Sequence, residues 1–156
     1  MGISLRNDYP EIDIDTPGIE KKLGKILDHL GCLNKEVSIL FTGDRDIQNL
    51  NHEFRNVNQP TDVLSFPQNE EEDPYTHEEE ILGDIAVSLD TAQRQAKEHG
   101  LTFKEEIILL LIHGILHLLG YDHEISEQED KKMRSKTREL FKLVFPEKRL
   151  ADTCNY

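Results

Sequence analysis

The sequence has few of the features that mark secreted or membrane proteins. Its 156 residues include two cysteines, Cys32 and Cys154, which are too few for a disulfide scaffold and lack the spacing of a cysteine metal site. The N-terminal residues contain no basic and apolar signal segment. The longest apolar stretch, within residues 107–120, is interrupted by histidine and glycine and is too short to span a bilayer. These absences predict a soluble, cytoplasmic protein in a reducing compartment.

Positive charge is also scarce, because 18 Lys and Arg face 31 Asp and Glu, for a net charge of −13. Such a surplus of acid disfavours binding to nucleic acid, which depends on cations that neutralise phosphate. The distribution changes this expectation. Residues 131–149 carry eight basic and two acidic side chains, a local charge of +6, so the remainder carries −19. A basic surface can therefore coexist with overall repulsion.

Length and apolar periodicity predict one α+β domain over residues 1–156, because several strands precede helices without strict alternation. The segments expected to form strands are residues 36–42, 62–66 and 81–89, with further short strands at 3–5 and 11–14.

A helix that begins at a T-x-x-E capping box, Thr102 and Glu105, and ends at Gly120 is the central element of the predicted fold. It is apolar almost all round, so we expect it to be buried under one mixed sheet. A second capping box, Ser126 and Glu129, opens the last helix, which carries the basic side chains.

The buried helix contains histidines at the spacing of a metal site. His113 and His117 lie one turn apart on one face, and the turn at Gly120 can bring back His123 as a third ligand. Three neutral imidazoles and one open position are typical of catalytic zinc, which lowers the pKa of a bound water to about 7. Burying unpaired imidazoles among leucines would cost free energy, which disfavours a purely structural role. The other histidines are expected to be ordinary surface residues: His29, His52, His77 and His99.

The same HxxxHxxGxxH spacing occurs in metzincin proteases, which carry Glu directly after the first His as general base. Gly114 occupies that position here, which disfavours peptide hydrolysis unless another acid serves. Asp84 is a candidate general base or backbone cap, and Asp122 is a candidate to orient a ligand imidazole.

Four motifs together resemble the YbeY family of ribosomal-RNA maturation factors. They are LNHEFR at 50–55, PTDVLSFP at 60–67, LGDIAVS at 82–88 and HGILHLLGYDH at 113–123. The histidine motif alone is shared with proteases, whereas its combination with PTDVLSFP is highly specific.

The resemblance implies a zinc-dependent, single-strand-specific endoribonuclease that acts in 3′-end maturation of small-subunit (16S) ribosomal RNA and in ribosome quality control. Its zinc ligands, one ion per chain, would be His113, His117 and His123, and its important arginine would be Arg55. The family often has Asp three residues after that arginine, where this chain has Asn58. The implied partners are single-stranded ribosomal RNA, the small subunit and its associated proteins, without a membrane.

The chemistry of the residues agrees with this implication. A three-histidine metal centre keeps its positive charge, so a metal-bound water or hydroxide can attack a phosphodiester. The guanidinium of Arg55 can bind phosphate through two parallel hydrogen bonds, although a surface ion pair is an equally good explanation from sequence alone. Thr61 and Ser65 could bind phosphate or cap turns.

Two alternative functions stay open at this point. One is a zinc peptidase with a displaced general base. The other is a non-catalytic ribosome-binding module with structural zinc, which requires a fourth ligand such as Asp122 or Cys154. The basic stripe on the last helix could follow an RNA backbone or be a solvated face.

Overall fold

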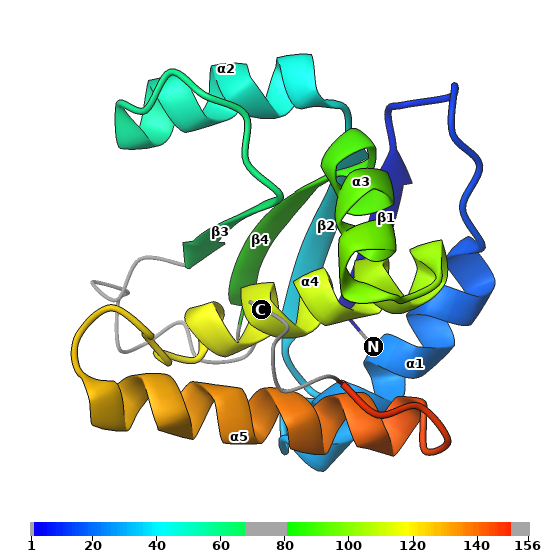
Figure 1. Cartoon of the computed structure of the whole chain (residues 1–156), viewed down its shortest axis with the longest axis vertical. Coiled ribbons are helices and arrows are strands. Elements are labelled where there is room, and N and C mark those ends of the chain that lie inside the picture. Colours follow the sequence, from blue (N-terminus) through cyan, green and yellow to red (C-terminus); the bar gives the residue numbers. More distant parts are fainter. Residues whose placement is uncertain (1, 68–80, 151–156) are drawn as a thin grey trace.

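The computed structural model describes residues 2–67 and 81–150, and the acidic segment 70–80 and Cys154 lie outside these residues. The helices and strands occur in the following order along the chain (Figure 1): β1 (Gly2–Asn7), α1 (Thr16–His29), β2 (Glu36–Thr42), α2 (Asp44–Arg55), β3 (Val63–Pro67), β4 (Ile81–Ser88), α3 (Leu89–His99), α4 (Phe103–Leu118) and α5 (Glu127–Val144).

The strands form one four-stranded mixed sheet in the order β1-β2-β4-β3. The β1–β2 and β2–β4 pairs are parallel, whereas β3 pairs with β4 in the antiparallel direction. The α+β class and the three main strands are thereby confirmed. The short strand expected at residues 11–14 is wrong: Ile12 N–H donates to the Tyr9 carbonyl and Asn7 Nδ2 donates to the Ile12 carbonyl, so the chain turns there.

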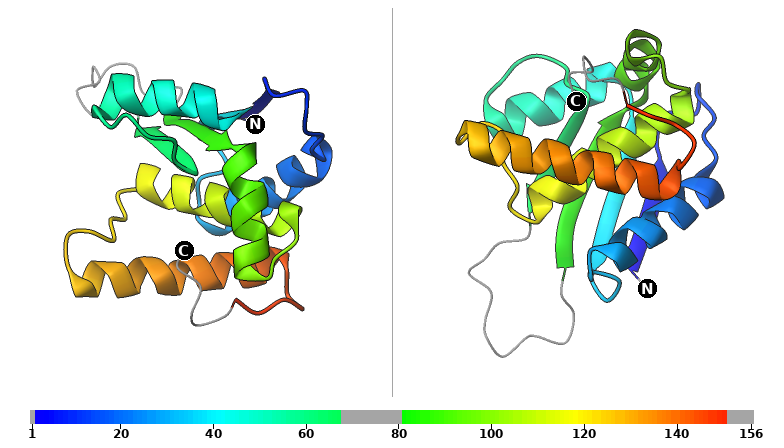
Figure 2. Two further views of the ribbon diagram at one scale, coloured as in Figure 1. Left: turned by 45° about the horizontal axis from the view of Figure 1, so that its top comes forward. Right: turned by 60° about the horizontal axis from the view of Figure 1, so that its bottom comes forward.

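Helix α4 is buried between the sheet and α5, as its apolar sequence predicts. The capping box is present in both directions: Thr102 Oγ1 accepts from Glu105 N, and Glu105 Oε1 accepts from Thr102 N. Every residue from Glu106 to Ile112 is buried. The two further views show α5 lying across α4 on the side away from the sheet (Figure 2). The site helix is therefore held on two sides.

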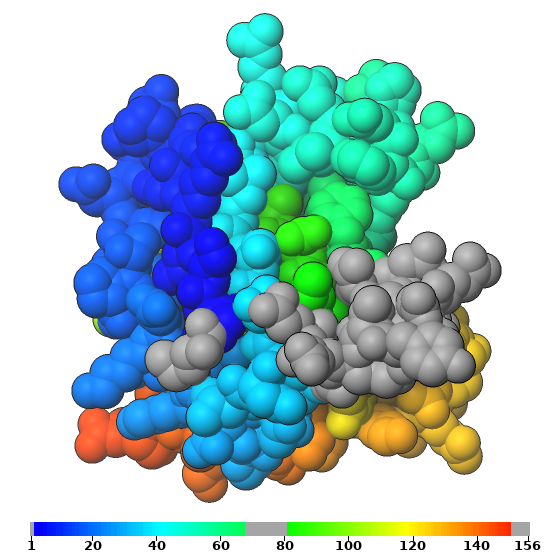
Figure 3. Space-filling view, turned by 180° about the vertical axis from the view of Figure 1, so that it is seen from behind, coloured from blue at the N-terminus to red at the C-terminus, as the bar shows by residue number. Residues whose placement is uncertain are grey.

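Helix α2 covers part of the opposite face of the sheet. Its Ile47 packs with Leu64 of β3 and Ala86 of β4 in a small second core. Side chains alternate along a strand, so the neighbours Val63 and Ser65 point toward α4 instead. From behind, β2 and β4 reach the surface beside α2 (Figure 3). No helix within residues 2–67 and 81–150 has the length and apolar character needed to cross a membrane.

Candidate functional site

Helix α4 presents His113 and His117 on one face, one turn apart. The surrounding residues of the helix face the core, so the two imidazoles are the polar groups of this turn. Directly after His113, Gly114 packs against β4: a Cβ at this glycine would lie 2.9 Å from Ile85 Cδ1. The residue after the first histidine therefore faces the sheet and not the imidazoles.

The end of α4 reverses the chain and brings the third histidine close. Gly120 has φ +96°, which favours glycine, and its N–H donates to the His117 carbonyl at 3.0 Å. Tyr121 N–H donates to the Leu116 carbonyl at 2.9 Å. After this turn, the His123 ring lies with its centroid 5.5 Å from the centroid of His117.

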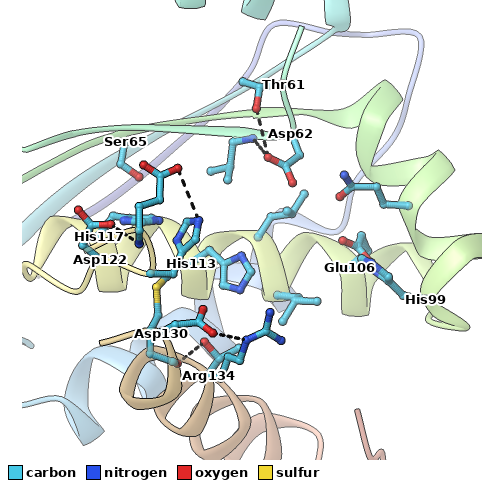
Figure 4. A pocket seen from close by; sticks show the side chains of 18 of the residues that line it. Thr61, Asp62, Ser65, His99, Glu106, His113, His117, Asp122, Asp130 and Arg134 are labelled. Atoms are coloured by element: carbon cyan, nitrogen blue, oxygen red, sulfur yellow. Dashed lines mark hydrogen bonds and ion pairs between the residues drawn. The ribbon is translucent and has the colours of Figure 1, made fainter. Parts of the chain in front are cut away.

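All three histidines line one cavity of about 440 Å³. The cavity runs along α4 between β3 and α5, and Figure 4 shows His117 near one end and Glu106 with His99 near the other. Other residues of its wall come from α2, the segment before β3, α3 and α5: Arg55, Thr61, Asp62, Gln95, Met133, Arg134 and Thr137. The fold thus assembles residues that are far apart in the sequence around the histidines.

The environment of His113 and His117 favours their neutral form. Burial, together with the charges of the neighbouring His117 and His123, lowers the pKa of His113 to about 3. Burial, followed by the charge of His123, also lowers the pKa of His117. A neutral imidazole has a nitrogen lone pair for a metal, so this set of donors fits a transition metal such as zinc.

The third histidine, His123, is more exposed than the sequence predicts for a metal ligand. The His123 side chain is 49% exposed, and its Nε2 lies 3.9 Å from Glu124 Oε1. Among the residues that the structure describes, no three His, Cys, Asp or Glu side chains converge on one point that would hold a metal ion. The third imidazole therefore has to turn toward the other two before all three can bind one ion.

Arg55 reaches the same cavity from the end of α2. The helix stops at Asn56, which adopts a left-handed conformation with φ 60° and leaves the side chain of Arg55 exposed at the cavity. The positive charge of Arg55 contributes to the lowered pKa of His117, after the effects of burial and of His123. The arginine and the histidine motif, which are far apart in the sequence, are thus brought together.

Several other candidates have mainly structural contacts. Ser65 Oγ donates to the Gly114 carbonyl at 3.3 Å, and Thr61 Oγ1 donates to Asp62 Oδ1 at 3.4 Å. Asp122 Oδ1 accepts from Glu124 N at 2.8 Å, which shapes the turn before α5. Asp84 is exposed on β4 and does not line the cavity, so its role as a general base has no support from the geometry.

Sequence reasoning missed an ionisable pair at the other end of the cavity. Glu106 is fully buried, and its Oε1 lies 2.6 Å from Nδ1 of His99, a residue expected to be on the surface. Burial raises the pKa of Glu106, while the hydrogen bond to His99 acts in the opposite direction. One signal was present: Glu106 lies seven residues before His113 and therefore on the same stripe of α4.

The profile of the family described as Endoribonuclease YbeY matches residues 4–144. This chain belongs to the YbeY endoribonuclease family. A Persephonella marina protein named Endoribonuclease YbeY is 50% identical over 142 residues, which cover 91% of this chain and 92% of that protein. The Aquifex aeolicus protein of the same name is 49% identical over 116 residues, or 74% of this chain and 75% of that protein.

A solved structure shows the same fold. The solution structure of a Thermotoga maritima protein superposes with a TM-score of 0.64 at 30% sequence identity and covers 93% of this chain and 90% of its own. The YbeY resemblance drawn from the four sequence motifs is therefore confirmed.

Proposed function

We propose that this chain is a zinc-dependent endoribonuclease that cleaves single-stranded segments of small-subunit ribosomal RNA during 3′-end maturation and ribosome quality control. The observation that supports this most directly is that three imidazoles and one guanidinium line a single cavity of a YbeY-family chain. The phosphate groups of RNA carry the negative charge that a metal ion and a guanidinium in such a cavity would bind. The small ribosomal subunit and its proteins would be the partners that position it.

His113, His117 and His123 would hold the metal, one ion per chain. A divalent ion bound by three imidazoles supplies a Lewis acid and a water of lowered pKa at the phosphate. Arg55 would bind the non-bridging phosphate oxygens through its planar guanidinium and stabilise the charge that develops as the phosphodiester breaks. The apolar side chains behind the histidines exclude water and strengthen these electrostatic interactions.

The packing of Gly114 disfavours the peptidase alternative. Because a Cβ at this position would contact Ile85, a carboxylate there would point at the sheet and not at the histidines. The metzincin-type general base therefore has no place in this helix. A non-catalytic module with structural zinc would need a fourth protein ligand beside the three histidines.

The test compares the metal content and single-stranded RNA cleavage of wild type with those of His117→Ala. His52→Ala is the matched control, because His52 is an exposed histidine on α2 that does not line the cavity. We expect about one metal ion per wild-type chain, with metal and cleavage both lost in His117→Ala and both kept in His52→Ala. Undiminished RNA cleavage by a metal-free His117→Ala protein would overturn the proposal.

A further inference from the structure

The side chain of Glu106 has an oxygen without a partner. Among the described residues, Oε2 of Glu106 is the one buried side-chain polar atom that forms no hydrogen bond. Leaving a buried acceptor unsatisfied costs free energy, more for a charged group than for a neutral one. Such an atom in a native protein requires an explanation, and a bound ligand that donates a hydrogen bond would provide one.

This carboxylate belongs to the cavity that contains the histidines. Glu106 lies about 10 Å along α4 from His113, given a rise of 1.5 Å per residue over seven residues. Both line the cavity, and Figure 4 shows them along the same helix with His117 beyond. A ligand whose phosphate lies near His117 and Arg55 could therefore extend along α4 to Glu106.

The stretch between the two ends has the chemistry of a pocket for a flat aromatic ring. Its walls include apolar side chains, Val63, Leu109, Leu110 and Met133. Polar groups are gathered at the far end, where Glu106, His99 and Gln95 line the cavity. Apolar side chains beside a few directed hydrogen-bonding groups are the usual arrangement in sites that bind an unstacked base.

We propose that this end of the cavity binds one nucleobase of the RNA and that Glu106 Oε2 accepts a hydrogen bond from an amino group on the pairing edge of that base. The proposal rests on the function proposed above, since it takes RNA as the ligand. His99 holds the other carboxylate oxygen at 2.6 Å and so fixes the direction of Oε2.

The same geometry disfavours two other ligands. Phosphate would be repelled, because Glu106 is acidic and the charge of Asp62 also acts on it. A divalent cation such as Mg²⁺ needs about six oxygen ligands, whereas one carboxylate oxygen of Glu106 is already paired with His99. A single donor from a neutral ring matches the one acceptor that is left.

Cytidine monophosphate and uridine monophosphate form a matched pair of probes. On the pairing edge, cytosine has an amino group where uracil has a carbonyl, and uracil has one additional proton on a ring nitrogen. Their binding to the metal-free full-length chain would be measured by NMR titration of backbone amides. We expect the cytidine nucleotide to bind about tenfold more tightly, the factor that one hydrogen bond to a charged group supplies. The amides of residues 99 and 106 should shift.

Glu106→Gln should bring this ratio close to one, because its neutral amide can turn either its oxygen or its nitrogen toward the base. Glu98→Gln should keep the ratio, since it removes the same charge from an exposed position outside the cavity. The wild-type comparison needs no variant, so the proposal remains falsifiable if Glu106→Gln fails to fold. Equal affinities, tighter binding of the uridine nucleotide, or no binding at the cavity would overturn it.

A magnesium titration distinguishes binding of a cation at Glu106 from binding of a nucleobase. Mg²⁺ alone could shift the amide signals of residues 99 and 106 in wild type but not in Glu106→Gln. This result would show that the end of the cavity binds a cation instead of a nucleobase and would overturn the proposal. Cleavage assays distinguish this failure from failure of the proposed function. RNA cleavage without nucleotide discrimination would contradict only the base pocket, whereas discrimination without any cleavage would contradict only the nuclease activity.

Discussion

Arg55 is the single residue whose role can be separated most cleanly from folding. Its side chain is exposed at the cavity, and the core of the protein does not depend on it. We expect Arg55→Ala to lower kcat/KM for RNA cleavage by about 10²- to 10³-fold, because charge stabilisation in the transition state is lost. The melting temperature and metal content should remain those of wild type, since exposed substitutions change stability little.

The control for this prediction is Arg45→Ala, which removes an equal charge from an exposed position on the same helix, α2. Arg55→Lys should recover part of the activity, because lysine keeps the charge but not the planar pair of donors. Steady-state cleavage of a labelled single-stranded RNA, with thermal unfolding in parallel, measures both quantities. Equal losses in Arg55→Ala and Arg45→Ala would show a general charge effect instead of a phosphate contact.

At this scale, sequence reasoning located the residues with distinctive spacing and missed those without it. His113, His117 and His123 stand out because they share a helix and its terminating turn, and the structure does bring them to one cavity. Glu106 and His99 have no such motif, since their pairing depends on how α3 packs against α4. The carboxylate of Asp44, at the start of α2, likewise accepts hydrogen bonds from Ser88 Oγ and Thr91 Oγ1 on another segment.

Among the elements, strand β4 depends most on one glycine. Gly83 has φ +145°, and a Cβ there would lie 2.4 Å from the Phe66 carbonyl oxygen of the neighbouring strand β3. The ladder between β2 and β4 is also irregular beside this residue, since Glu36 pairs with Ile81 and Val37 pairs with Gly83. A side chain at Gly83 would thus push β3 away from β4.

We expect Gly83→Ala to lower the free energy of unfolding by about 2 to 4 kcal/mol, from backbone strain and the collision with β3. Gly24→Ala is a control of the opposite sign, because Gly24 lies within α1 with open space around its Cβ position. Alanine there should stabilise the protein by about 0.5 to 1 kcal/mol. Urea unfolding followed by circular dichroism measures both. A Gly83→Ala protein as stable as wild type would contradict this account of β4.

The helix boundaries show which local sequence signals are enough to predict where a helix begins. The capping box at Thr102 and Glu105 is confirmed, because both hydrogen bonds lie within four consecutive residues. Helix α3 is capped by the side chain of Ser88, whereas Asp90 in its first turn accepts from Tyr9 Oη and Asp44 N. A carboxylate near a helix start can serve a distant segment instead, and the sequence does not reveal that choice.

For the whole molecule, the sequence predicted the α+β class, the main strands and the buried helix, because each depends on a local apolar pattern. It did not predict the strand order or the antiparallel direction of β3, because these depend on contacts between distant segments. That order places Val63 and Ser65 of the edge strand over α4 and so builds one wall of the cavity. The grouping of the three histidines was thus predictable, whereas the shape of the cavity around them was not.

The charge distribution over the whole molecule leads to a prediction about RNA binding. Arg134 lines the cavity that holds the histidines, and Arg138 and Lys142 follow it at four-residue intervals along α5. Arg138 and Lys142 border a second hollow of about 410 Å³, together with Lys148 and Arg149. On a chain of net charge −13, these residues form a row of basic side chains along α5 that begins at the candidate site.

We expect the double variant Arg138→Ala, Lys142→Ala to bind single-stranded RNA about tenfold more weakly at low salt. The slope of log affinity against log salt should become shallower by about 1.4, or about 0.7 for each phosphate that the variant no longer neutralises. Lys21→Ala, Lys25→Ala on α1 removes the same charge from exposed positions elsewhere and is the matched control. Equal effects of the two double variants would show that overall charge, and not this stripe, controls binding.

Returning metal to a chelator-treated protein while single-stranded RNA cleavage is recorded tests the central claim most directly. The account predicts no cleavage without metal and a rise to a plateau at about one equivalent of Zn²⁺ in wild type. His117→Ala should show no such plateau. Full cleavage by metal-free wild type, or zinc-restored cleavage at the wild-type level in His117→Ala, would contradict the claim that these histidines hold the catalytic metal.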